Sequence, residues 1–485
     1  MPYLFPADNP GFRGPSHPSR VECDLFELEY EGVLPPELNG RFYRCGPDPQ
    51  FVPRFKDDIG INGDGMVSMF RMNDGHVDFR QRFVRTDKFR AERAARRALF
   101  GHYRNRFTDD PSVAGVDRTT ANTSILWHGG RLFAIKEDGL PHELDPDTLE
   151  TLGKFNFGGQ LRSPHFTAHP KLDPVSGELL FYGFEVAGET SPTLAYAVAD
   201  RDLNLLSEEW FDAPYASMVH DFAVTEHHAV FLVMPTTSNL ERMKAGGFHF
   251  AWDDSLPSYI GVVPRRGGVK NVRWFKGPGR WSFHTMNAFE EGSKLHIDLT
   301  VSEINGFAYI PSADGKPWNP ERAKSCLTRW TVDLAGTSDT FSEHCLWDTA
   351  SDFYKTDPRV QTRPYRHGFM AARDTTRAPA TQGPAPFNTL ARIDHQTGQV
   401  DTWWAGEAST VQEPQFVPRG PGAAEGEGWL LAVVGRLAEH RSDLVVLDAL
   451  NLAAGPVATV HLPMFLRMTF HGEWVPEPEI TATRN

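Results

Sequence analysis

Residues 172–182 read LDPVSGELLFY, a polar turn followed directly by an apolar run. Asp, Pro, Ser and Gly favour tight turns, whereas Leu, Phe and Tyr suit a buried strand. The same pattern recurs along the chain from about residue 125 onward. Comparable turns lie between strand-like runs at residues 144–148, 263–268, 332–336, 393–398 and 447–451. The sequence therefore predicts an all-β array of hairpins.

The composition agrees with many short strands, since 42 glycines and 37 prolines accompany 34 phenylalanines and 12 tryptophans. No βαβ alternation is present, so a doubly wound parallel sheet is not expected. A β-sandwich and a β-propeller both remain open, and a propeller needs roughly 40–60 residues per blade. We expect one domain over residues 1–485, with residues 1–24 as an extended arm. Residues 88–107 and 236–258 are expected to be mostly helical or loop insertions that cover one face.

The overall charge limits the partners of this protein. A net charge of −14 disfavours binding to phosphate backbones, so nucleic acid is not an expected partner. The basic stretch at residues 88–106 reads as a solvated amphipathic helix and a loop. The N-terminus lacks a secretory signal, and no apolar run reaches the roughly 20 residues that span a bilayer. Four widely spread cysteines without CxxC spacing indicate reduced thiols, so a cytoplasmic protein without membrane insertion is expected.

Four of the 19 histidines stand in settings that differ from the others. They are His169, His220, His284 and His471. Successive members lie 51, 64 and 187 residues apart, and the last interval is close to three times the earlier ones. Ligands carried one propeller blade apart, followed by a gap of several blades, would give this spacing. Four imidazoles could hold zinc, copper, iron or nickel, or each histidine could be hydrogen-bonded separately at a strand end.

The segments around these histidines carry a family resemblance. FTAHPKLDP (166–174), MVHDF (218–222), SFHTMNAFE (282–290) and FHGEW (470–474) resemble the metal-binding segments of carotenoid cleavage oxygenases. INGDGM (61–66) and NGRFYRCGP (39–47) resemble two further motifs of that family, in the same order along the chain. The resemblance implies a seven-bladed β-propeller with Fe(2+) on its axis, held by the four histidines. It also makes a homodimer a candidate assembly.

The family usually orients three of its ligand histidines with glutamates. Glu137 and Glu413 match two of those positions, and Asp352 stands at the third with a side chain one methylene shorter. Such outer carboxylates fix the imidazole tautomer and raise its basicity. Each of the three acids could instead be an ordinary surface charge.

Other matched positions concern oxygen and substrate. Thr123 matches a threonine near the oxygen-binding position, and Phe307 resembles an aromatic wall residue, although core packing is an equal alternative. Tyr103 and Lys136 match positions where lignostilbene dioxygenases carry tyrosine and lysine. A para-hydroxyl held by both groups becomes phenolate-like and can push electrons along a stilbene to its central alkene. The alternative for both residues is a place in a surface loop. Ile61 stands where stilbene-cleaving relatives often have phenylalanine.

The sequence thus predicts an iron(II) dioxygenase that splits 4-hydroxystilbenes with O2 into two aromatic aldehydes. Two other functions are considered as alternatives. An apocarotenoid oxygenase would use the same scaffold with a longer apolar tunnel. An iron-free propeller would act as a binding or scaffold module.

Overall fold

The strands of the chain form antiparallel sheets in which sequence neighbours mostly pair. A computed structural model describes residues 4–377 and 387–482. Contacts within the chain define two compact units. Unit 1 comprises residues 1–155, 353–357 and 366–485, and unit 2 comprises residues 156–352 and 358–365. The single-domain organisation expected from the sequence stays a prediction.

Unit 2 contains three four-stranded sheets and a two-stranded ribbon. Their strands are β10 (Lys171–Leu172), β11 (Leu179–Phe184), β12 (Thr193–Ala199) and β13 (Leu205–Asp212); β14 (Phe222–Val224), β15 (His228–Val233), β18 (Ser258–Pro264) and β19 (Arg273–Gly277); β20 (Thr285–Glu291), β21 (Lys294–Val301), β22 (Cys326–Asp333) and β23 (Ser342–Trp347); and the ribbon of β16 (Thr236–Ser238) and β17 (Phe250–Trp252). The core lies between neighbouring sheets. One cluster joins Val230 and Ile260 of the second sheet to Ile297 and Trp330 of the third.

Unit 1 contributes the remaining sheets. Their strands are β1 (Cys23–Leu25), β5 (His76–Phe83), β4 (Asp64–Asn73), β3 (Gly40–Asp48) and β33 (Gly472–Pro476); β2 (Tyr30–Gly32), β32 (Pro456–Leu462), β31 (Arg441–Asp448), β30 (Gly428–Arg436), β28 (Ser409–Val411) and β29 (Gln415–Pro418); β6 (Ser124–His128), β7 (Arg131–Ile135), β8 (His142–Leu144) and β9 (Thr151–Lys154); and β24 (Ser351–Thr356), β25 (His367–Ala372), β26 (Thr389–Asp394) and β27 (Val400–Trp404). Strand β24 begins at the boundary of the two units.

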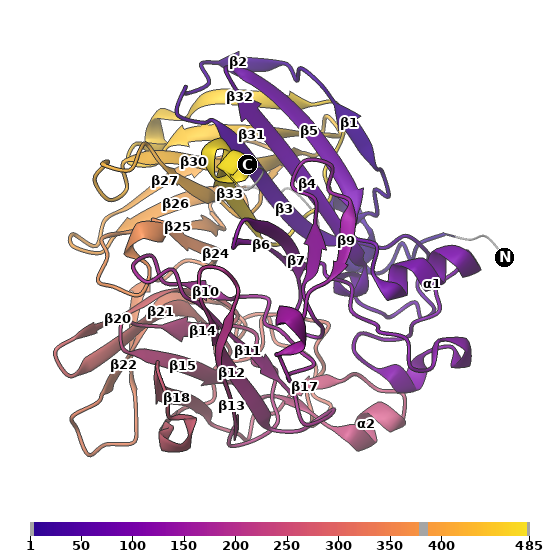
Figure 1. The fold of residues 1–485 in the computed structure, drawn as a ribbon, viewed down its shortest axis with the longest axis vertical. Helices are drawn as coiled ribbons and strands as arrows, with labels where there is room; N and C mark the ends of the chain where they lie inside the picture. The colour runs from indigo at the N-terminus through magenta and orange to yellow at the C-terminus, as the bar shows by residue number, and fades with distance from the viewer. Residues whose placement is uncertain (1–3, 378–386, 483–485) are drawn as a thin grey trace. The chain divides into compact units, whose positions relative to one another are not determined.

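The described residues thus form seven sheets of four or more strands, the number expected for seven blades. In unit 1 the two ends of the chain share sheets, as the indigo and yellow strands of Figure 1 show. N-terminal β3 pairs with C-terminal β33, and β2 pairs with β32. Each pairing occupies backbone groups that an edge strand would otherwise leave open.

Both predicted insertions contain a helix. Residues 88–107 hold most of α1 (Asp87–Ala95), which begins where the Thr86 side chain accepts a hydrogen bond from the backbone N–H of Phe89. Residues 236–258 hold α2 (Leu240–Lys244). Within the second insertion, β16 and β17 flank this helix as a two-stranded ribbon. Strands of three residues are too short to show an alternating pattern.

The N-terminal arm, as far as it is described, contains two short 3-10 helices. Arg467 fixes them, because its guanidinium donates to the backbone carbonyls of Gly11 (3.0 Å) and Ser16 (2.8 Å). The other helical elements are brief. The 3-10 helices are η1 (Pro10–Phe12), η2 (Gly14–Ser16), η3 (Gly60–Asn62), η4 (Arg106–Thr108), η5 (Pro111–Val113), η6 (Phe157–Gly159), η7 (Val269–Asn271), η8 (Pro358–Val360) and η9 (Leu452–Ala454), and the last α-helix is α3 (Glu477–Ala482). Among the described residues, no helix combines the length and the apolar character needed to cross a membrane.

Candidate metal centre

The four candidate ligands occupy equivalent places in the topology. His169, His220 and His284 come one or two residues before β10, β14 and β20 respectively. Each of these strands is the terminal strand of its sheet. In unit 1, His471 immediately precedes β33, which is also terminal in its sheet. Because each of the four histidines stands at the start of a terminal strand, the intervals between the histidines follow the intervals between the sheets.

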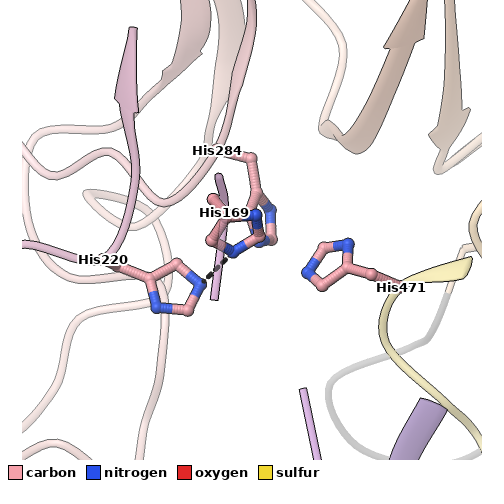
Figure 2. A group of neighbouring side chains, drawn as sticks. All are labelled: His169, His220, His284 and His471. Atoms are coloured by element: carbon pink, nitrogen blue, oxygen red, sulfur yellow. Dashed lines mark hydrogen bonds between the residues drawn. The ribbon is translucent and has the colours of Figure 1, made fainter. Parts of the chain in front are cut away.

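Three of these histidines form a tight cluster within unit 2. Nε2 of His169 lies 3.0 Å from Nε2 of His220. The ring centroid of His284 lies 5.0 Å from that of His169 and 5.2 Å from that of His220. Two nitrogens at right angles on one ion, with bonds of about 2.1 Å, would be about 3.0 Å apart. The three rings of unit 2, which Figure 2 draws together with His471, therefore fit a shared metal ion.

The orientation of His284 is set by Asp352. Nδ1 of His284 lies 2.8 Å from Oδ1 of Asp352, which belongs to β24. A carboxylate at Nδ1 keeps the proton on that nitrogen and leaves Nε2 as the metal donor. The side chain of Asp352, although one methylene shorter than glutamate, thus reaches the histidine directly.

In unit 1, Glu413 makes the corresponding contact with His471. Oε1 of Glu413 lies 2.7 Å from Nδ1 of His471, and its Oε2 accepts the Gly472 N–H at 2.7 Å. Burial alone would raise the pKa of Glu413, but Lys355, His471 and these hydrogen bonds lower it to about 2. The backbone N–H of His471 donates to the Thr123 carbonyl at 3.2 Å. Thr123 and Glu413 therefore both lie against His471.

We expect Asp352→Ala and Glu413→Ala to lower iron affinity or activity by about 10–100-fold with the fold intact. The reason is that each histidine would lose the acceptor that fixes its tautomer. Asp352→Glu should be tolerated, and Glu321→Ala, at an exposed acid, serves as the matched control. Iron content and oxygen uptake are the measurements. Alanine variants that match the parent in both would show that these acids do not orient ligands.

An aromatic cluster backs the histidines of unit 2. Phe283 stacks on His220 with ring centroids 3.7 Å apart and planes 8° apart. Phe307 meets Phe283 edge-on at 4.7 Å, and Trp281 contacts both rings. Phe307 therefore belongs to the aromatic layer behind His220. Sequence reasoning missed Phe283 and Trp281, although both stand within three residues of His284.

Tyr103 and Lys136 lie together in the interior of unit 1. The Lys136 ammonium is 5.0 Å from the centroid of the Tyr103 ring, and the Tyr103 hydroxyl donates to Oε1 of Glu137 at 3.1 Å. Tyr103 is 8% exposed and Lys136 is 2% exposed, which excludes the surface-loop alternative for both. The contact with Tyr103 is a role that the sequence did not suggest for Glu137.

Neighbouring groups set the charge of this pair. Burial lowers the pKa of Lys136, and Asp138, whose Oδ2 lies 3.1 Å from Nζ, opposes that effect. The ammonium also donates to the Thr120 hydroxyl at 2.9 Å. Burial raises the pKa of Tyr103 well above its usual range, and the negative charge of Glu137 raises it further. The hydroxyl therefore remains a neutral donor. Asp138 was missed because an acid two residues after Lys136 is unremarkable in sequence.

One buried carboxylate ties the Ile61 turn to the Tyr103 segment. Asp58 accepts hydrogen bonds from the backbone N–H of Tyr103 (3.1 Å) and from the Asn62 amide (2.7 Å). The Asn62 amide also donates to the Gly101 carbonyl at 2.9 Å. The Ile61 carbonyl accepts from Asn122 at 2.8 Å. The segments that carry Ile61 and Tyr103 are thus held together.

Comparisons with known proteins find relatives that match almost the full length of the chain. A family model described as retinal pigment epithelial membrane protein matches residues 16–476. The chain is 48% identical over 474 residues to an isoeugenol monooxygenase of Pseudomonas nitroreducens, which covers 97% of this chain and 99% of that protein. It is 46% identical over 475 residues to lignostilbene-α,β-dioxygenase isozyme III of Sphingomonas paucimobilis, which covers 96% and 97%.

A crystal structure of Pseudomonas brassicacearum lignostilbene dioxygenase superposes with a TM-score of 0.94 at 46% identity. The match covers 98% of this chain and all (100%) of that chain. Together with the seven sheets of the described residues, this likeness confirms the seven-bladed β-propeller.

Proposed function

The chain belongs to the carotenoid cleavage oxygenase family of non-haem iron oxygenases, and from that premise we propose that it cleaves the central double bond of 4-hydroxystilbenes with O2. The products would be two aromatic aldehydes. The observation that carries the choice of substrate is the buried pair of Lys136 and Tyr103. An ammonium and a phenol placed side by side in a buried interior suit the hydroxyl of a phenolic substrate.

We assign ferrous iron to His169, His220, His284 and His471. Support comes from the clustered ring nitrogens of unit 2 and from the carboxylates at Nδ1 of His284 and His471. Neutral imidazoles are ligands that iron accepts. Bound ferrous iron would supply the activation of O2. Glu137 as a third orienting acid and Thr123 beside the oxygen position remain predictions.

The roles of Tyr103 and Lys136 follow from their protonation. Tyr103 keeps its proton, and the hydroxyl would donate a hydrogen bond to the substrate oxygen by turning that proton away from Glu137, its acceptor in this structure. Lys136 can donate a charge-assisted bond to the same oxygen, and this bond strengthens as the phenol approaches phenolate. Phe307 and the neighbouring aromatic layer would give the substrate an apolar wall. Each contribution favours a ring with a free para-hydroxyl group.

A phenylpropene of the isoeugenol type is the second candidate substrate. It carries the same para-hydroxyphenyl group conjugated to an alkene but has no second ring. Two observations favour it: the 48% identity to an isoeugenol monooxygenase, and Ile61 at a position where an aromatic residue would contact a stilbene ring. An apocarotenoid is disfavoured, because a hydrocarbon chain offers no hydroxyl group to the buried donors Lys136 and Tyr103.

A direct competition separates these substrates. Iron-loaded enzyme is given equal concentrations of a 4-hydroxystilbene, isoeugenol and an apocarotenoid, and each aldehyde product is quantified over time. We expect the hydroxystilbene to be consumed fastest and the apocarotenoid to survive. Preferred cleavage of isoeugenol would move the assignment to phenylpropenes, and preferred cleavage of the apocarotenoid would overturn the phenol-based proposal. Absence of both iron and turnover would favour a binding module. Cytoplasmic location and a homodimer remain predictions.

A further inference from the structure

A β-bulge in unit 2 places two cysteines and an aspartate on one face of a sheet. Leu327 of β22 pairs with Trp347 of β23, whereas the next residue, Thr328, pairs with Cys345. Leu346 is therefore the extra residue of the bulge. In a regular strand, Cys345 and Asp348 would point to opposite faces, because their separation is odd. The extra residue turns both to the same face.

The register then brings Cys326 beside these two residues. Continuing the pair of Leu327 with Trp347 sets Cys326 opposite Asp348, and Cys326 shares a face with Thr328, the partner of Cys345. The two Sγ atoms and a carboxylate oxygen all lie within 4.8 Å of one another. Cys345 and Asp348 are exposed and Cys326 is half-buried, so solvent reaches the group. β23 is the terminal strand of its sheet, which leaves its outer side unpaired within that sheet.

We propose that Cys326, Cys345 and Asp348 form a second metal site, separate from the histidines, that binds a thiophilic divalent cation such as Zn2+. Zinc prefers thiolate sulfur at about 2.3 Å and carboxylate oxygen at about 2.0–2.2 Å, so two protein donors on one tetrahedral ion lie about 3.5–3.8 Å apart. Small rotations of exposed side chains reach that separation. A solvent water would complete a tetrahedron. The two thiols give up their protons to solvent on binding, so affinity should rise with pH.

Soft ligands distinguish this site from the histidine cluster. Thiolates select zinc, cadmium and similar ions, whereas imidazoles also take ferrous iron. The bound cation would join the end of β23 to β22. Binding should therefore stabilise the fold as the metal concentration rises above its dissociation constant.

The test uses reduced, desalted full-length protein already loaded with iron, titrated with Cd2+ under anaerobic conditions. Cadmium–thiolate bonds give an ultraviolet charge-transfer band that histidine ligands do not. We expect this band to saturate at one Cd2+ per chain, to fall when Zn2+ is added, and to leave the iron content unchanged. Cys326→Ser and Cys345→Ser should each remove most of the band. Asp348→Asn, at an exposed position, should weaken affinity by about tenfold or more and keep the band.

Cys23→Ser is the matched control, because Cys23 is a half-buried cysteine in the other unit, and it should bind cadmium as the parent does. The proposal is overturned if the parent shows no band that saturates at one equivalent. It is also overturned if the double variant Cys326→Ser/Cys345→Ser keeps the band. Formation of a Cys326–Cys345 disulfide in place of cation binding, seen as the loss of two free thiols despite added Zn2+, would contradict it as well.

Discussion

Alanine at any one of the four histidines is expected to remove most of the bound iron and nearly all activity, because each imidazole supplies one coordination bond. The four positions are His169, His220, His284 and His471. The loss should be larger than for Asp352→Ala or Glu413→Ala, because these acids contact a histidine and would act on the metal only through it. Iron is measured by metal analysis after anaerobic loading, and activity by oxygen uptake.

Two exposed histidines provide controls. His227→Ala and His440→Ala should keep both iron and activity, since their side chains lie at turns on the surface. Circular dichroism of every variant separates loss of a ligand from loss of the fold. Full iron occupancy in any one of the four ligand variants would remove that histidine from the assignment.

Lys136→Met is expected to lower turnover of a hydroxystilbene by roughly 10- to 150-fold while the substrate still binds. A charge-assisted hydrogen bond contributes about 1.5–3 kcal/mol, and 1.4 kcal/mol corresponds to about tenfold. Since this bond strengthens as the phenol gives up its proton, its loss raises the barrier more than it weakens binding. Tyr103→Phe should have a smaller effect of the same kind, because a neutral donor is lost.

The matching change in the substrate is a methyl ether at the para-hydroxyl group. The parent enzyme should cleave the ether slowly, and Lys136→Met should then add little further penalty, because both changes remove the same interaction. Lys324→Met, at an exposed lysine, is the control. Oxygen uptake is measured for the four combinations of two enzymes and two substrates. The four rates give the coupling energy between Lys136 and the para-hydroxyl group. Equal rates with the phenol and the ether in the parent enzyme would refute the phenolate mechanism. An apocarotenoid oxygenase would then be the leading hypothesis.

Local chemistry explains why much of the fold could be predicted from the sequence. In the stretch LDPVSGELLFY, Asp173 accepts a hydrogen bond from the Val175 N–H at 3.1 Å, and Gly177 adopts a φ of +71°. These local contacts form the turn between β10 and β11, and Arg265 adds one long-range hydrogen bond to Asp173 at 2.6 Å. Likewise, a histidine stands one or two residues before each of the strands β10, β14, β20 and β33, and this placement produces the spacing seen in the sequence.

The parts that could not be predicted depend on contacts between distant segments. Asp138 reads as a common acid until the buried ammonium of Lys136 is found 3.1 Å away. Phe283 gains its role only by stacking on His220, 63 residues earlier in the chain. Cys326 and Cys345 show no metal-binding spacing in the sequence. The pairing of β22 with β23 brings the two cysteines together, and the bulge at Leu346 adds Asp348. A single sequence carries no direct signal for such contacts between distant residues.

The most direct test of the central claim is oxygen consumption after anaerobic loading of metal-free enzyme with Fe(2+). The enzyme is mixed with a 4-hydroxystilbene, and both oxygen uptake and aldehyde products are measured. Our account predicts no uptake before iron is added, and afterwards one O2 consumed for each two aromatic aldehydes formed. Fully iron-loaded enzyme that consumes no oxygen and leaves the hydroxystilbene intact would contradict it.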